Sequence, residues 1–207
     1  MLTFNTFRRY LFTGIFIMLT MDGLTNSAAA AEQTAVFAGG CFWGVDAVFK
    51  HVKGVSGVVS GYAGGLAATA YYELVSSGDT GHAESVQVRF DPVQVSYQQL
   101  LQVFFSVAHD PTQLNHQGAD VGSQYRSAIF YTNNEQQKTA QNYIQQLTAQ
   151  HAFPSAIVTQ VVPLEKFYAA EEHHQNYLAL HPYQPYIVSC DLPKLAQLHK
   201  RFPELYK

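Results

Sequence analysis

Residues 34–52 constrain the fold of this chain most, because they join a strand pattern directly to a helix pattern. The run 34–38 (TAVFA) is short, apolar and β-prone, and Gly39-Gly40 ends it. Residues 43–52 (WGVDAVFKHV) then place apolar side chains at helical spacing. Cys41 is therefore expected at a strand-to-helix junction, where free amide groups and the helix dipole favour an anion. We expect a thiol of lowered pKa there.

Strand and helix patterns alternate along the rest of the chain. The sequence predicts strands at 55–60, 83–90, 127–131 and 157–164, and helices at 71–76, 97–108, 134–150, 168–180 and 193–202. Residues 110–124 lack periodicity and are rich in turn formers, which indicates a loop. Since no repeat or linker interrupts this order, we expect one domain with a sheet covered by helices, of the α/β or α+β class.

The segment 83–90 (AESVQVRF) alternates cleanly, so that Val86, Val88 and Phe90 share one face of a strand. Glu84 has the same parity. A carboxyl on the buried face of a strand is desolvated, which raises its pKa and lets it keep a proton near neutral pH. Glu84 is therefore a candidate acid.

The first 31 residues differ from the rest. Arg8 and Arg9 precede an apolar run at 10–21 and small residues at 27–31, the three-part pattern of a secretory signal peptide. The apolar run is roughly half the length that a membrane-spanning helix needs. We therefore expect a cleaved leader at 1–31, export by the ordinary route, and a mature domain at 32–207 in the periplasm or outside the cell, without stable membrane association.

Charge and histidine spacing exclude other classes. The net charge is −3 and the basic residues are scattered, so nucleic acid is not an expected partner. Of the nine histidines, His173 and His174 are adjacent and cannot share a helical face, and no HExxH motif occurs. This spacing predicts no metal site, and we expect a monomer.

The two cysteines allow two interpretations. In an oxidising compartment Cys41 and Cys190 would ordinarily be taken as a structural disulfide. A mature chain of this length does not need one to fold. Phe42 and Trp43 place aromatic faces beside Cys41, which suits an apolar, methyl-bearing substrate. A buried, unreactive cysteine remains the alternative on this pattern alone.

Three separated motifs carry a resemblance. GCFWG at 40–44, Tyr72 with GHAE at 81–84, and QGADVGSQYRS at 117–127 together resemble the peptide methionine sulfoxide reductase A (MsrA) family, over about residue 35 to the C-terminus. The resemblance implies a single α+β domain whose central mixed sheet has a ferredoxin-like core, covered by helices and long coil segments. It also implies thiol-dependent reduction of methionine-S-sulfoxide, free or in proteins, without a metal or organic cofactor. Together with the predicted leader, this indicates repair of oxidised exported proteins.

The resemblance also assigns roles to residues. It implies that Cys41 is the nucleophile and Glu84 the acid, that Tyr72 and Tyr125 bind the sulfoxide oxygen with Asp120 in support, and that Phe42 and Trp43 line the methyl pocket. The chemistry agrees, since a sulfoxide sulfur is a poor electrophile until its oxygen is protonated. Cys41 would become a sulfenic acid, which needs a second thiol for its reduction.

Cys190 departs from the family pattern. The best-known pattern has a resolving cysteine directly after a Pro-Tyr pair, but Ile187 follows Pro185-Tyr186 here and Cys190 lies three residues further on. This resembles the branch that an external thiol reduces directly. Cys190 is thus either a resolving thiol or a half-buried strand cysteine that only packs. A thioredoxin-like protein or another thiol is the expected reductant.

Two rival functions stay open on the sequence. One is another exported thiol enzyme, a peroxidase or hydrolase, that pairs Cys41 with His82. Strand parity puts His82 on the side of Glu84, which favours a structural role for it. The other rival is a non-catalytic binding domain held by a Cys41–Cys190 disulfide.

Overall fold

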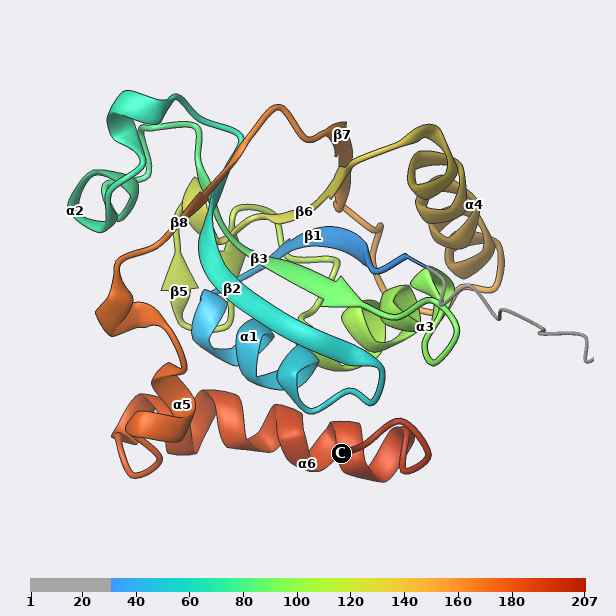
Figure 1. Cartoon of the computed structure of the whole chain (residues 1–207). Helices are drawn as coiled ribbons and strands as arrows, with labels where there is room; N and C mark the ends of the chain where they lie inside the picture. Colours follow the sequence, from blue (N-terminus) through green and yellow to red (C-terminus); the bar gives the residue numbers. More distant parts are fainter. Residues whose placement is uncertain (1–30) are drawn as a thin grey trace, which may run out of the picture.

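The computed structural model describes residues 31–207, and the predicted leader falls almost entirely outside them. One mixed sheet has the strand order β7-β6-β1-β3-β2-β8 (Figure 1). Its strands are β1 (Gln33–Gly39), β2 (Val55–Ala63), β3 (Ala83–Phe90), β6 (Ser127–Tyr131), β7 (Gln160–Pro163) and β8 (Phe167–Ala169). The helices are α1 (Phe42–Lys50), α2 (Tyr72–Val75), α3 (Tyr97–Val103), α4 (Asn134–Ala149), α5 (Tyr177–Leu180) and α6 (Leu192–Arg201).

The connectivity confirms the expected α+β fold. Strands β6, β1, β3 and β2 pair antiparallel in that order, and the chain runs β1-α1-β2-β3-α3-β6 through them. This is the ferredoxin-like arrangement. Strand β7 adds a parallel neighbour to β6, and β8 adds an antiparallel one to β2.

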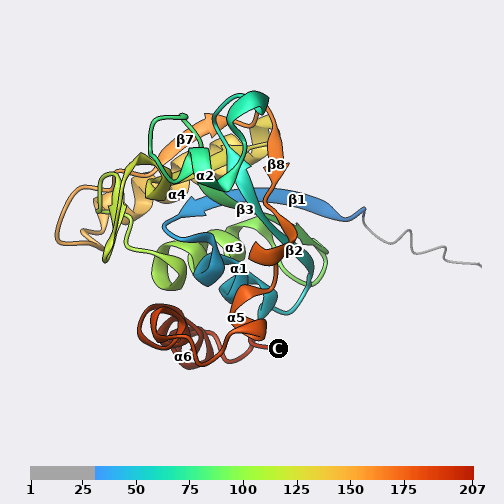
Figure 2. The same cartoon turned by 90° about the vertical axis from the view of Figure 1, so that its left-hand side faces the viewer.

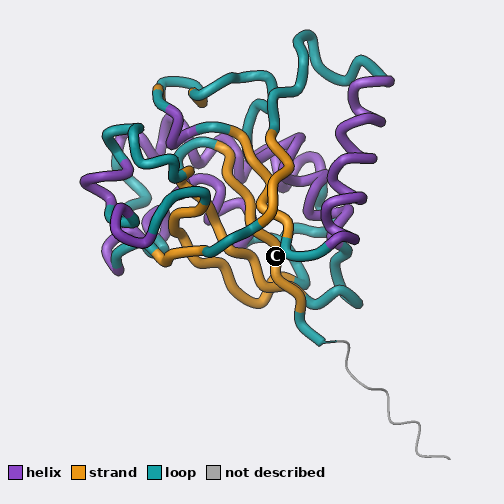
Figure 3. The backbone as a smooth tube through the Cα atoms, turned by 90° about the horizontal axis from the view of Figure 1, so that it is seen from above, coloured by secondary structure: helices purple, strands orange, loops and turns teal. Residues whose placement is uncertain are grey.

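The main core lies between the sheet and the helices beneath it. Figures 1 and 2 show α1 and α3 against one face of the sheet, with α6 outside α1. The Phe37 ring stacks at 5.0 Å from Phe49 of α1 and at 4.9 Å from Phe104. The opposite face carries a smaller cluster with Val36 and Phe130. Seen from above, loops run over this second face (Figure 3).

The predicted helix 168–180 is wrong. Phe167–Ala169 is strand β8 instead, paired with residues 61–63 of β2. Backbone pairing along the free edge of β2 outweighs the local helical pattern. Gly61 permits the approach, since a Cβ there would lie 2.2 Å from the Tyr168 carbonyl oxygen. Asn176, at φ 54°, then limits the helix to Tyr177–Leu180.

Four further segments differ from the prediction. Residues 110–124 contain a small hairpin, β4 (His116–Gln117) with β5 (Asp120–Val121), and the predicted strand 157–164 shortens to 160–163. The helix from Tyr97 ends as an α-helix at Val103 and continues as a π-helical turn. Cys190 lies in a second π-helical turn, Ile187–Asp191, rather than in a strand. Hydrogen bonding beyond i+4 cannot be inferred from apolar spacing alone.

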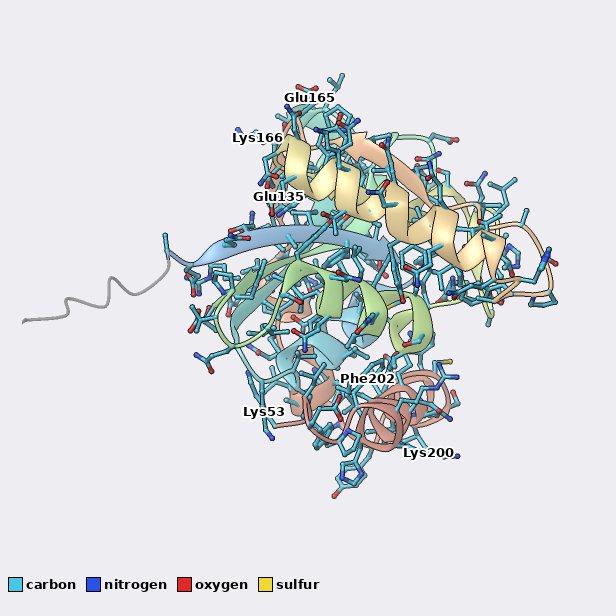
Figure 4. All side chains as sticks on the ribbon, turned by 90° about the vertical axis from the view of Figure 1, so that its right-hand side faces the viewer. Lys53, Glu135, Glu165, Lys166, Lys200 and Phe202 are labelled. Carbon is cyan, nitrogen blue, oxygen red and sulfur yellow. The ribbon has the colours of Figure 1, made fainter. Side chains whose placement is uncertain are left out.

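The surface away from α2 mixes both signs of charge. Figure 4 shows Lys53 and Lys200, a residue of α6, at one end of the molecule, and Glu135, Glu165 and Lys166 at the other. This distribution agrees with the scattered basic residues of the sequence. Within residues 31–207, every helix is too short or too polar to cross a membrane.

Candidate active site

Cys41 occupies the junction that the sequence predicts. Strand β1 ends at Gly39, and Cys41 is the N-cap residue of α1. Gly40 has φ +88°, and a Cβ there would lie 2.6 Å from the Gln117 side chain, so only glycine fits the turn. Cys41 is 8% exposed and its thiol is free, as is that of Cys190.

Glu84, near the start of β3, reaches the first turn of α1. Its Oε2 accepts a hydrogen bond of 3.0 Å from the backbone N–H of Phe42, and its side chain is buried. Burial raises the pKa of Glu84 to about 8, with Asp120 adding to the rise, while the bond from Phe42 opposes it. Glu84 therefore holds a proton at neutral pH, as its strand parity predicted.

The prediction of a lowered pKa for Cys41 is wrong in direction. Burial raises the pKa of the Cys41 thiol well above its usual value, and the carboxyls of Glu84 and Asp191 add to the rise. A hydrogen bond from the Trp43 backbone and the charge of Lys194 oppose it. The helix terminus therefore does act on the thiol, but desolvation outweighs it. The resting thiol keeps its proton.

One cavity gathers the predicted residues. It has a volume of about 160 Å³ and is lined by Cys41, Phe42, Trp43, Tyr72, Glu84, Asp120, Tyr125 and Tyr186. Of the side chains predicted from the sequence, only Cys190 is not on its wall. Tyr72 and Tyr125 are half-buried, and burial raises the pKa of each, so both phenols stay protonated donors.

Tyr186 is a cavity residue that sequence reasoning missed. Its hydroxyl donates to the carboxylate of Asp120, and its ring meets Trp43 edge-on at 5.9 Å. Asp120 is therefore a hydrogen-bond partner inside the cavity. The sequence analysis used the Pro185-Tyr186 pair only to note that no cysteine follows it, and it gave Tyr186 itself no role.

The segment before α6 also fixes the cavity wall. Glu171 accepts hydrogen bonds from the Tyr72 backbone N–H at 3.0 Å and from the Tyr62 hydroxyl at 2.8 Å. The Trp43 indole stacks on the Tyr177 ring at 3.7 Å with an interplanar angle of 5°. These contacts hold the indole and Tyr72 in place, and no local pattern predicted them.

His82 does not pair with Cys41. Its Nδ1 accepts from the Gly65 N–H at 3.2 Å, which leaves Nε2 to donate to the Leu66 carbonyl at 3.0 Å. With both nitrogens committed, the ring has no free base for a Cys-His pair. Among residues 31–207, no three His, Cys, Asp or Glu side chains gather as metal ligands would.

Gly44 allows the C-terminal segment to pack on α1. A Cβ at Gly44 would lie 2.1 Å from Asp191 Oδ1, and Asp191 is fully buried. We expect Gly44→Ala to lower the free energy of unfolding by about 1–3 kcal/mol, measured by urea denaturation. Gly57→Ala is the control, because its Cβ meets only the flexible end of Arg89. Equal losses in the two variants would contradict the packing argument.

The fold and the site together define a cysteine-dependent enzyme: a buried thiol and a buried neutral acid line one aromatic cavity. Comparison with known proteins makes this specific. The model of the peptide methionine sulfoxide reductase family matches residues 33–205, and the chain belongs to this family. It is thus an enzyme of the methionine sulfoxide reductase class.

Similar proteins support the assignment. A peptide methionine sulfoxide reductase MsrA 2 of Mesorhizobium japonicum is 56% identical, over 88% of this chain and 94% of its own. An MsrA of Deinococcus radiodurans is 49% identical over 88% and 90%. Among solved structures, reduced Mxr1 from Saccharomyces cerevisiae aligns with a TM-score of 0.70 at 32% identity, covering 75% of this chain and 88% of that one.

Proposed function

We propose that this enzyme reduces methionine-S-sulfoxide, free or within oxidised exported proteins, with Cys41 as nucleophile and Glu84 as acid. One observation carries the proposal: the Cys41 thiol and a carboxyl whose pKa is raised to about 8 line one cavity. Phe42 and Trp43 offer that cavity an apolar wall for the substrate methyl group. The preference for the S epimer rests on family membership.

Glu84 is the proton donor of the first step. Protonation of the sulfoxide oxygen makes its sulfur electrophilic, and the neutral carboxyl of Glu84 supplies that proton. The same carboxylate then takes the proton of Cys41 as its sulfur attacks. The phenols of Tyr72 and Tyr125 stabilise the charge on the oxygen. The sulfoxide S–O bond then breaks and the hydroxyl passes to Cys41 as methionine leaves, so that the methionine sulfur gains two electrons and Cys41 is oxidised to a sulfenic acid.

The raised pKa of Cys41 fits this sequence of events. A thiol that keeps its proton at rest resists stray oxidation, because the thiolate is the reactive form. A bound sulfoxide changes this, since its oxygen accepts the proton that Glu84 passes on. Activation of Cys41 is then coupled to the presence of substrate.

The reductant that we propose is a thioredoxin-like protein. The yeast relative Mxr1 has been solved in complex with Trx2. If the leader is cleaved, such a protein must act outside the cytosol, in the periplasm or beyond. Fusion of residues 1–31 to a reporter active only outside the cytosol tests export, and cytosolic retention of the fusion would overturn it.

The function is tested by a single turnover without reductant. The reduced enzyme is mixed with excess methionine-S-sulfoxide, and methionine is quantified against the R epimer, hydrogen peroxide and a thioester. We expect one equivalent of methionine per enzyme from the S epimer and much less from the R epimer. Absence of methionine together with rapid turnover of peroxide or thioester would instead support the rival thiol-enzyme function.

A further inference from the structure

A second cavity, of about 180 Å³, adjoins the active-site cavity. The two share Cys41, Asp120 and Tyr186, and the second cavity is also lined by Cys190 and Lys194. Cys41 therefore lines both cavities, the one proposed to hold the substrate and the one that also carries a second thiol. The sequence does not reveal that the two cysteines line one cavity, because they lie 149 residues apart.

The π-helical turn Ile187–Asp191 brings Cys190 to this place. Ile187 and Asp191, at its two ends, are buried, which anchors the turn against α1. Cys190 is half-buried between these anchors, with its Sγ 3.5 Å from the Ser189 hydroxyl. π-helical turns are rare and are frequent at functional sites, where the extra residue changes which side chains face inward.

The second cavity also suits the departure of water. Lys194 lines this cavity, and its ammonium group pairs with Asp191 at 3.4 Å, which leaves two of its three N–H donors outside that ion pair. The Tyr186 hydroxyl, bonded to Asp120, borders the same space. A hydroxyl that leaves Cys41 would therefore meet a cation and hydrogen-bond partners rather than an apolar wall.

We propose that Cys190 is the resolving thiol of this enzyme, attacking the sulfenic acid of Cys41 across the second cavity. The step rests on the proposed function, which supplies the sulfenic acid. An S–S bond forms between Cys190 and Cys41, the S–O bond of Cys41 breaks, and the thiol proton of Cys190 leaves with the hydroxyl as water.

The test uses the full chain and one addition of methionine-S-sulfoxide without reductant. Wild type, Cys190→Ser and the control Val188→Ala are compared for methionine release, free thiols and peptide masses. Val188 is an exposed residue of the same turn, so its variant leaves both thiols unchanged. We expect all three to release one equivalent of methionine. Wild type and the control should lose both free thiols and yield a Cys41–Cys190 peptide, whereas Cys190→Ser should accumulate a sulfenic acid that a 1,3-diketone traps.

The outcomes separate the two proposals. Failure of wild type to release methionine contradicts the proposed function, whereas release followed by a persistent sulfenic acid and a free Cys190 overturns only the resolving role. A disulfide between two copies of the chain overturns it as well. With a thioredoxin as reductant, we also expect Cys190→Ser to lose at least about tenfold in steady-state turnover, since a protein thiol then has no disulfide to attack. Unchanged turnover would mean direct reduction of Cys41.

Discussion

Cys41→Ser is expected to abolish methionine release, in single turnover and at steady state alike. The serine hydroxyl is a much weaker nucleophile than a thiol, and its oxygen cannot be oxidised to an analogue of the sulfenic acid. No other thiol on the wall of the substrate cavity replaces it, since Cys190 lines only the second cavity. The measurement is methionine formed per enzyme in the assay described above.

This loss should come without loss of stability, which distinguishes chemistry from misfolding. Cys41 is the N-cap residue of α1 and makes no side-chain cap hydrogen bond. Serine is a preferred N-cap residue, and its hydroxyl accepts from the first free N–H groups of a helix. The variant should therefore unfold at or above the wild-type urea concentration. A clearly destabilised variant, or one that still releases methionine, would contradict the assigned role.

Local patterns predicted the positions of Cys41 and Glu84 correctly. Strand parity placed Glu84 on the buried face, and the Gly-Gly turn placed Cys41 at the start of a helix. Both depend only on residues adjacent in sequence, where periodicity is informative. The four strands of the ferredoxin-like core were found for the same reason.

The C-terminal third is where prediction failed. Its segments are positioned by partners distant in sequence: β8 by the edge of β2, Tyr186 by Asp120, and Asp191 by the absence of a side chain at Gly44. The spacing of apolar residues does not reveal contacts with distant segments, so the short strand β8 was predicted as part of a helix. The pKa of Cys41 was misjudged similarly, because the helix terminus is a local feature whereas burial depends on the whole fold.

Glu84→Gln is expected to slow methionine release by about 10²–10⁴-fold, the usual range for loss of a general acid. Glutamine keeps the shape and still accepts from the Phe42 N–H, but it has no proton to give to the sulfoxide oxygen. Asp46→Asn is the matched control, since Asp46 is a buried carboxyl of α1 that pairs with Lys50 and lies outside the cavity. We expect the control to react at the wild-type rate.

The pH dependence gives the sharper test of Glu84, because acid and thiolate mechanisms predict opposite slopes. The active form of Glu84 is protonated, and its pKa in the free enzyme is about 8. The kcat/KM for sulfoxide should therefore be level below that pH and fall about tenfold per pH unit above it. An enzyme that depends on a preformed thiolate would instead become faster as the pH rises. Glu84→Gln should lose the fall near pH 8, whereas Asp46→Asn should keep it. A wild-type rate that increases through this range would contradict the role of Glu84 as acid and mean that Cys41 ionises before the substrate binds.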